Sequence, residues 1–173
     1  IGIMAILVTA ATVVLNPAQL LAQARDSQRI SDLDALKTSL SLYLSDYISP
    51  DLDGATVGCS TLCYTQVSGV AINCGARHGA KTTAPDADRT TDALGWLPVN
   101  LSAISGGSPL PSLPIDPVIN STTYFYSYAC DNSALTFELN ANLESTKYVL
   151  KEANTSDGGN IDTIYEIGTS LTL

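Results

Sequence analysis

Residues 1–15 read IGIMAILVTAATVVL, an uninterrupted apolar run, and Asn16 and Pro17 follow it. From Ala18 to Tyr47 the chain becomes amphipathic, because charged residues alternate with apolar ones at spacings of three and four. Such spacing places the apolar residues on one face of a helix. We therefore predict helix over 1–47. It is apolar on every side at its start and apolar on one face only at its end. The one-sided face comprises Ile30, Leu33, Leu36, Leu40, Tyr43 and Tyr47.

The apolar run on its own is typical of a signal-peptide core or a buried helix. Its 15 residues span about 22 Å, less than the ~30 Å core of a bilayer. No basic region precedes it and no small-residue cleavage site closes it. Because it starts abruptly, we expect the natural segment to extend upstream and to form a hydrophobic stalk. The stalk residues predicted to pack against other copies are Ile1, Ile3, Ile6, Leu7, Val8, Val13, Val14 and Leu15.

Pro17 interrupts the predicted helix. It lacks an N–H and clashes with the preceding turn, so the helix is expected to kink or open locally there, with Asn16 extended. The alternative is a modest bend in which Asn16 caps a second helix that starts at Pro17. Pro50 is expected to end the helix by residues 48–51.

Several stretches resemble the bacterial type IV pilins and the related pseudopilins. They are GIMAILV at 2–8, LNPA at 15–18 and ARDSQRISDLDALKTSLSLY at 24–43. Further along, LPIDPVIN at 113–120, YFYSY at 124–128 and FELNANLE at 137–144 are similar to the loop and sheet of the pseudopilin-like head. Family members begin with a cleaved leader, an N-methylated first residue and a glutamate a few residues in, none of which lies in this sequence.

The resemblance implies a filament subunit. Its stalk would anchor it in the inner or cytoplasmic membrane, and would then pack with stalks of other copies in an extracellular filament on the cell surface. Its partners would be copies of itself and the pilus assembly machinery, and the filament would serve adhesion, motility or uptake. In assembled pili of the resembled family a segment in this neighbourhood is melted, so the resemblance implies a melted segment near residues 12–19. The alternatives are a pseudopilin of a type II-like secretion system and a membrane-tethered binding module.

The expected fold class is α+β, a long N-terminal helix packed on a small antiparallel β-sheet, with a large disulfide-stapled loop. Residues 1–17 form the stalk, 18–47 the amphipathic helix, 48–120 the loop-rich region and 121–173 the sheet and C-terminal segment. Alternation of period two predicts a hairpin in the last region. The expected strands are Thr122–Tyr128, Leu135–Leu143, Tyr148–Leu150 and Ile164–Ile167.

Four cysteines, all beyond the helix, indicate two disulfides and an oxidising compartment. Cys59 and Cys63 form a loose CxxxC without a second close pair, which does not favour zinc. A hairpin of 63–67 with 70–74 would set Cys63 opposite Cys74 and leave Cys59 for Cys130. That pairing is preferred among the three connectivities.

The formal net charge is −9 and basic clusters are absent, which excludes a phosphate-tracking nucleic-acid surface. No nucleophile elbow, Walker loop or HExxH motif occurs, so no catalytic residue is assigned and an enzyme is not expected. His78 lies between glycines and is expected to be exposed, with no Ser or Cys arranged beside it. Trp96 is expected to anchor the loop region to the body of the protein.

Three further features carry weaker hypotheses. Arg25, Asp26 and Arg29 are interpreted either as a solvated surface pair or as charges that join subunits. The segment Asp157–Asp162 gathers carboxylates, an amide and glycines, so it is a candidate calcium loop or an ordinary turn. No other cofactor is expected. The Asn-x-Ser/Thr triplets at Asn100, Asn120 and Asn154 are candidate glycan acceptors.

Overall fold

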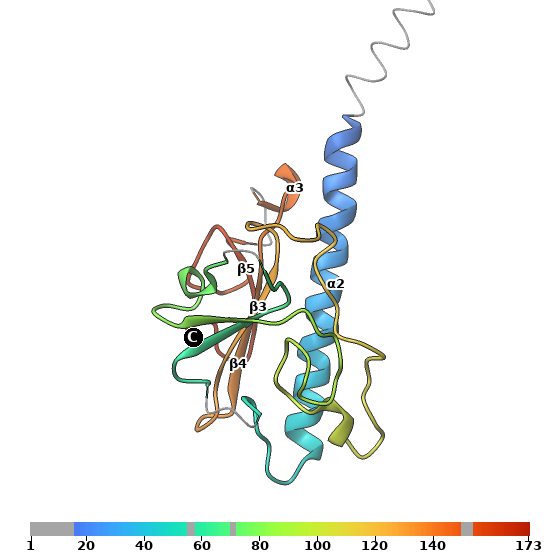
Figure 1. Cartoon of the computed structure of the whole chain (residues 1–173). Coiled ribbons are helices and arrows are strands. Elements are labelled where there is room, and N and C mark those ends of the chain that lie inside the picture. Colours follow the sequence, from blue (N-terminus) through green and yellow to red (C-terminus); the bar gives the residue numbers. More distant parts are fainter. Residues whose placement is uncertain (1–15, 55–57, 70–71, 150–153) are drawn as a thin grey trace, which may run out of the picture.

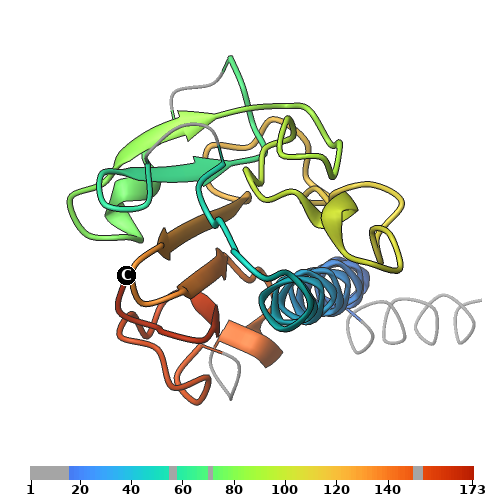
Figure 2. The same cartoon turned by 90° about the horizontal axis from the view of Figure 1, so that it is seen from below.

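The computed structural model of the chain describes residues 16–54, 58–69, 72–149 and 154–173. One long helix, α2 (Pro17–Asp46), lies along one face of a five-stranded sheet, and its N-terminal end extends beyond the rest of the molecule (Figure 1). The fold is therefore α+β, as predicted. The segment between α2 and the central strands covers one side of the head, and the C-terminal segment covers the other (Figure 2).

Helix α2 begins where the local chemistry favours a start. Pro17 occupies the first helical turn, where its missing N–H is no loss, and the Asn16 side chain accepts a hydrogen bond from Gln19 N at 3.4 Å. The capping by Asn16, which was the alternative interpretation of this segment, is confirmed. The expected extended backbone is wrong, because Asn16 is left-handed at φ 35° and ψ 75°. The helix ends at Asp46, one residue before the predicted end.

The sheet is mixed rather than purely antiparallel. Its order is β2-β1-β3-β4-β5, and β1 pairs with β2 in parallel while the other neighbours are antiparallel. The central hairpin was predicted, although its strands begin and end at shifted residues. The strands are β1 (Leu62–Thr65), β2 (Thr82–Pro85), β3 (Tyr126–Asp131), β4 (Thr136–Ala141) and β5 (Tyr165–Gly168).

Two predicted local structures are wrong. Strand β1 pairs with β2 and β3, so the expected hairpin of 63–67 with 70–74 does not form, and Cys74 starts the short helix η1 (Cys74–Ala76). The segment expected as a strand at 148–150 begins inside the short helix α3 (Thr146–Val149). A third short helix, η2 (Leu101–Ala103), contacts α2.

The core lies between α2 and one face of the sheet. Leu33, Leu36 and Leu40 are completely buried there. Alternate residues of the strands point toward them, namely Tyr126, Tyr128 and Cys130 of β3, Phe137, Leu139 and Ala141 of β4, and Ile167 of β5. On the opposite face these strands carry a buried polar layer, which includes Ser127, Glu138, Asn140 and Glu166.

Candidate functional site

A buried cluster of charges fixes α2 to the head where the helix leaves it. We call it the junction cluster. Its centre is Arg29, whose side chain has no exposed surface. The guanidinium donates to both oxygens of Asp116, at 2.7 and 2.9 Å, and to Asp26 at 2.8 Å. It also lies 2.6 Å from Glu144. The cluster comprises Arg25, Asp26, Arg29, Asp116 and Glu144.

The other members tie the helix to the segment that follows β4. Arg25 donates to both carboxylate oxygens of Glu144, at 2.8 and 2.6 Å. The Asp26 carboxylate accepts backbone N–H groups of Glu144 and Ser145 at 2.9 and 2.7 Å. Hydrogen bonds from Arg25 lower the pKa of Glu144, and the same contact raises that of Arg25. The cluster thus joins three separate segments through charge-assisted hydrogen bonds.

This geometry corrects the interpretation of Arg25, Asp26 and Arg29. Asp26 and Arg29 are fully buried and their partners lie within the same chain, so they are neither a solvated surface pair nor free to join subunits. Only Arg25 stays partly exposed. Sequence reasoning missed Asp116 and Glu144 as partners. A signal for the burial of Asp26 and Arg29 was present, since residues 22, 26 and 29 continue the spacing of 33, 36, 40 and 43, and all seven are buried.

The polar layer on the opposite face brings His78 to Ser127 and Glu138. His78 is 1 % exposed, so its expected exposure is wrong. Its Nε2 lies 3.0 Å from Ser127 Oγ, and its Nδ1 lies 3.6 Å from Glu138 Oε1. Burial, aided by the charge of Arg77, lowers the pKa of His78 to about 3. The imidazole is therefore neutral and forms no ion pair with Glu138.

The order serine, histidine and carboxylate is that of a nucleophile, a base and an orienting acid. Sequence reasoning did not bring these residues together. In the structure, however, each of the three is at most 1 % exposed, so no substrate reaches Ser127 Oγ in this conformation. The neighbouring Arg77 donates to the carbonyl oxygens of Phe125 and Thr123, at 2.7 and 2.9 Å, and to Asn142. The serine, histidine and glutamate, together with Arg77, therefore hold the buried polar layer in place.

Glu138 also meets Glu166 of the neighbouring strand. Burial raises the pKa of Glu138 to about 7 and raises that of Glu166. Glu138 accepts from Asn140 Nδ2 and from Leu173 N, at 2.9 and 2.8 Å, while Glu166 Oε2 accepts from Ile161 N at 2.9 Å. The remaining oxygen, Glu166 Oε1, has no donor. Burial thus favours the protonated form of both carboxyl groups.

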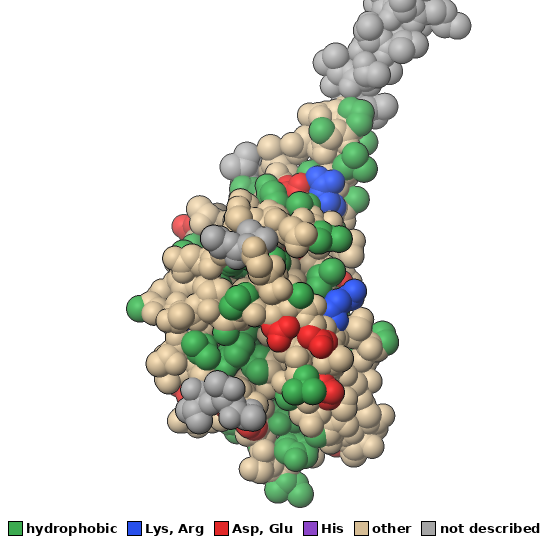
Figure 3. Space-filling view, in the orientation of Figure 1, with side chains coloured by type: hydrophobic (Ala, Val, Ile, Leu, Met, Phe, Trp, Pro, Cys, Tyr) green, Lys and Arg blue, Asp and Glu red, His purple; other side chains and the backbone are tan. Residues whose placement is uncertain are grey.

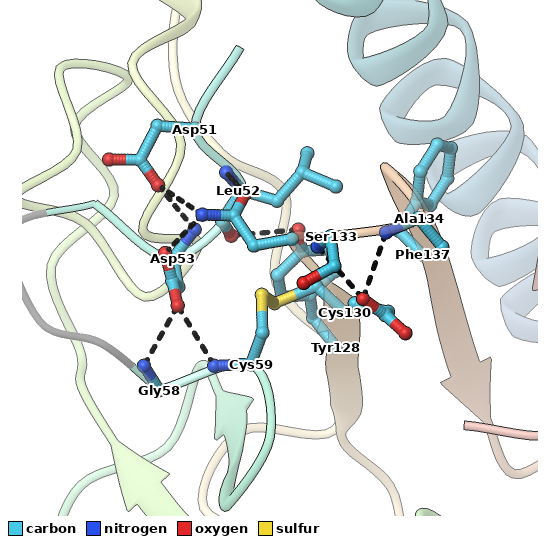
Figure 4. The surroundings of a disulfide bond; sticks show 12 residues. Asp51, Leu52, Asp53, Gly58, Cys59, Tyr128, Cys130, Ser133, Ala134 and Phe137 are labelled. Carbon is cyan, nitrogen blue, oxygen red and sulfur yellow. Dashed lines mark hydrogen bonds between the residues drawn. A yellow bond between two sulfur atoms is a disulfide. The ribbon is translucent and has the colours of Figure 1, made fainter.

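Two disulfides, Cys59–Cys130 and Cys63–Cys74, join the segment after α2 to the sheet, and this is the preferred pairing of the sequence analysis. Polar contacts support the first (Figure 4). Asp53 Oδ2 accepts from Gly58 N and Cys59 N, at 2.9 and 3.1 Å. Burial acts to raise the pKa of Asp53, but these hydrogen bonds outweigh it and the pKa is lowered. Asn132 Nδ2 donates to Asp53 Oδ1 at 3.0 Å, so the loop is fixed to the β3–β4 turn.

Trp96 anchors its loop as expected. Its side chain is 1 % exposed and its Nε1 donates to Pro114 O at 3.1 Å. The candidate calcium loop gains no support from its geometry. Both oxygens of Asp157 accept backbone N–H groups, from Gly159 at 2.9 Å and Glu166 at 2.7 Å. Across residues 16–54, 58–69, 72–149 and 154–173, no group of three or more His, Cys, Asp or Glu side chains is placed to hold a metal ion.

The stalk residues Ile1, Ile3, Ile6, Leu7, Val8, Val13, Val14 and Leu15 lie outside the described residues, so their predicted packing stays a prediction. Within the described part of the chain, no helix combines the length and the apolar character needed to cross a membrane. Comparison of the chain with models of protein families, with curated proteins and with solved structures finds no match.

Proposed function

We propose that the chain is a structural subunit of an extracellular filament of the type IV pilus kind, joined to its copies through the helix at its N-terminus. One observation carries the proposal. The end of α2 stands clear of the head and presents hydrophobic side chains (Figure 3), with Leu20 52 % and Leu21 61 % exposed. Apolar surface of this kind is stabilised by burial, at about 25 cal/mol per Å². The apolar residues 1–15 directly precede it.

The junction cluster supports the same role. A subunit that transmits load between a helical filament core and an outer head needs a fixed angle between the two. Arg29, Asp26 and Asp116 supply this through buried, charge-assisted contacts at the point of exit. A long helix on a sheet with the loop region closed by disulfides is also the arrangement that the resemblance to pilin heads implies.

The two disulfides favour an oxidising compartment, in keeping with a cell-surface location. Before assembly the subunit would be held in the membrane by the stalk. Its partners would then be other copies of the chain and the assembly machinery. No catalytic role is proposed, since the described serine, histidine and glutamate constellation is closed to solvent.

Electron microscopy of the surface fraction sheared from native cells, with mass spectrometry of the same fraction, tests the proposal. We expect thin filaments in which this chain is the dominant protein. Replacement of Leu7 or Val13 by Asp places a charge in the proposed filament core and should abolish the filaments. The matched control is Ile48→Asp, because Ile48 is fully exposed on the head and tolerates a charge.

Detection of the chain only in membranes, without filaments, would overturn the proposal. A secretion pseudopilin would then be recognised by short filaments that depend on a secretion system. A tethered binding module would be recognised by ligand binding that survives Leu7→Asp in the soluble fraction.

A further inference from the structure

The structure places the three Asn-x-Ser/Thr triplets of the chain in three different environments. These triplets begin at Asn100, Asn120 and Asn154. A transferase that attaches a glycan to such a triplet needs access to two groups, the Asn amide and the hydroxyl two residues later. The surroundings of these two groups therefore decide which triplet can accept a glycan.

The triplet at Asn154 is closed. Asn154 is 2 % exposed, so its amide lies inside the head, although the following Thr155 and Ser156 are exposed. Protein interiors are close-packed, so a bulky oligosaccharide on this amide would force the surrounding side chains apart. The triplet therefore cannot accept a glycan in the folded chain.

The triplet at Asn100 is exposed at its first residue, but the fold holds it in place. Asn100 pairs with Asp92 in an isolated antiparallel bridge and directly precedes η2. The middle residue, Leu101, is completely buried in the core. The Ser102 hydroxyl is engaged with Thr91, at 3.2 Å from its Oγ1 and 3.4 Å from its carbonyl oxygen. This triplet would have to leave the core in order to enter the active site of an enzyme.

The triplet at Asn120 is open at both of the required groups. Asn120 and Thr122 are exposed, and neither side chain forms a hydrogen bond with a described residue. The main chain of residues 119–122 forms none with another part of the described chain either. Asn120 has φ 58°, a left-handed conformation that asparagine adopts more readily than most residues, and it lies in a turn. The turn presents its amide to solvent.

The chain on either side of this turn is fixed. Before it, Val118 N donates to Oδ1 of Asp116, a member of the junction cluster, at 2.8 Å. After it, the Ser121 hydroxyl accepts hydrogen bonds from Thr123 N and Tyr124 N, at 3.1 and 2.9 Å. A local change of shape costs least where few contacts are lost. The turn can therefore adapt to an active site while β3 and the core stay in place.

An apolar surface lies beside the Asn120 amide. Ile119 is 70 % exposed and lines two shallow hollows, of about 220 and 270 Å³. Asn120 lines the first of them together with Val67 and Ile115. A sugar ring has an apolar face as well as hydroxyl groups. A sugar on Asn120 can therefore cover Ile119 while its hydroxyl groups face water.

We propose that Asn120 is a glycosylation site and carries an N-linked oligosaccharide. The donor is an oligosaccharide linked to a polyprenyl diphosphate. Asn120 Nδ2 forms a bond to the anomeric carbon of the first sugar, and the bond from that carbon to the phosphate oxygen breaks. The polyprenyl diphosphate leaves with the electron pair, and the proton that the amide loses passes to solvent.

The compartment suits this modification. The two disulfides indicate an oxidising environment, and N-linked glycans occur on surface loops of secreted proteins. The inference goes beyond the proposed function and does not depend on it, because a chain that stays in the membrane with its head outside presents the same triplet.

Mass spectrometry of the chain purified from its native cells tests this site, in both the sheared and the membrane fraction. After reduction of the disulfides, cleavage before aspartate gives the peptides 92–115, 116–130 and 131–156, and each of them contains one triplet. We expect the peptide 116–130 to carry the mass of an oligosaccharide, and its fragmentation to place that mass on Asn120. The other two peptides should be unmodified.

Variants of the triplet distinguish an N-linked glycan from other modifications. Thr122→Val removes the hydroxyl and keeps Asn120 in its turn, so the glycan should be lost, whereas Thr122→Ser should retain it. Asn120→Gln should also lose the glycan. Thr123→Val is the matched control, because Thr123 is equally classed as exposed and lies outside the triplet. This variant should keep the glycan.

The outcomes separate this proposal from the filament function. An unmodified peptide 116–130 from native cells would overturn it, and so would a glycan on Asn100 or Asn154 instead. A sugar that persists in both Asn120→Gln and Thr122→Val would overturn it as well, since that sugar would be linked to another hydroxyl. None of these results bears on the filaments, which microscopy detects whether or not the chain is glycosylated.

Discussion

Replacement of Arg29 by methionine should strongly destabilise the head. The side chain has no exposed surface and contacts Asp26, Asp116 and Glu144 at 2.6–2.9 Å. Methionine retains much of its volume but leaves these carboxylates buried without their central cation. Removal of one partner from a buried ion network typically costs 3–5 kcal/mol. At about 2–4 °C per kcal/mol for a domain of this size, the melting temperature should fall by about 10 °C.

The matched control is Arg25→Met. Arg25 belongs to the same cluster, but its side chain is 36 % exposed and it pairs with Glu144 alone. An exposed pair of this kind contributes less than about 1 kcal/mol. Thermal and urea unfolding of the full chain in mild detergent, followed by circular dichroism with both disulfides intact, measures the two variants side by side.

The pH dependence sharpens the test. The folded pKa of Glu144 is lowered by Arg25 and Arg29, so its contribution to stability is present above its unfolded pKa and is lost as the pH falls through the folded pKa. The difference between wild type and Arg29→Met should therefore be largest near neutral pH and should shrink in acid. A loss as small as that of Arg25→Met, or a difference that grows in acid, would refute the reasoning.

Three further perturbations are informative. Burial raises the folded pKa of Glu138 to about 7, above its usual 4.5, so the stability that this group contributes below pH 4.5 is lost as the pH rises through 7. Glu166→Gln supplies the missing hydrogen-bond donor, so the urea midpoint of this variant should stay constant over that pH range. A decline equal to that of the wild type would contradict this. Ala93→Gly relieves a left-handed alanine and should raise the free energy of unfolding by about 1 kcal/mol, and a decrease would show that no strain is stored. Joint replacement of Cys59 and Cys130 by Ser opens a loop of 71 residues and should cost about 4 kcal/mol, more than loss of the 11-residue cross-link, as calorimetry of both double variants would show.

The sequence predicted those parts of the fold that the local spacing of apolar residues determines. The spacing of Leu33, Leu36 and Leu40 predicted the buried face of α2, and alternation predicted the β3–β4 hairpin. Strand β2 was missed because Thr82–Pro85 is short, half-exposed and ends in proline, which is characteristic of an edge strand. Its parallel pairing with β1 depends on a crossover that no local pattern encodes.

The candidate site was harder to predict from the sequence for a related reason. Polar residues at helical spacing are normally read as surface, and Arg29 becomes buried only because carboxylates 87 and 115 residues away reach it. The glycines around His78 suggested exposure, whereas η1 places it against the polar layer. No local sequence pattern identifies the distant partners of a buried charge. Asp116 and Glu144 could therefore be recognised as partners of Arg29 only in the structure.

The cross-link from Cys59 to Cys130 has a mechanical consequence. Tension applied to the N-terminal end of α2 would first act on its noncovalent contacts, and would then extend the chain between Asp46 and Cys59. Those 13 residues reach about 45 Å when fully stretched. At that point the covalent bond passes the force straight to β3, so residues 60–129 lie outside the load path. A head of this design yields by a bounded length under traction and keeps most of its outer surface folded.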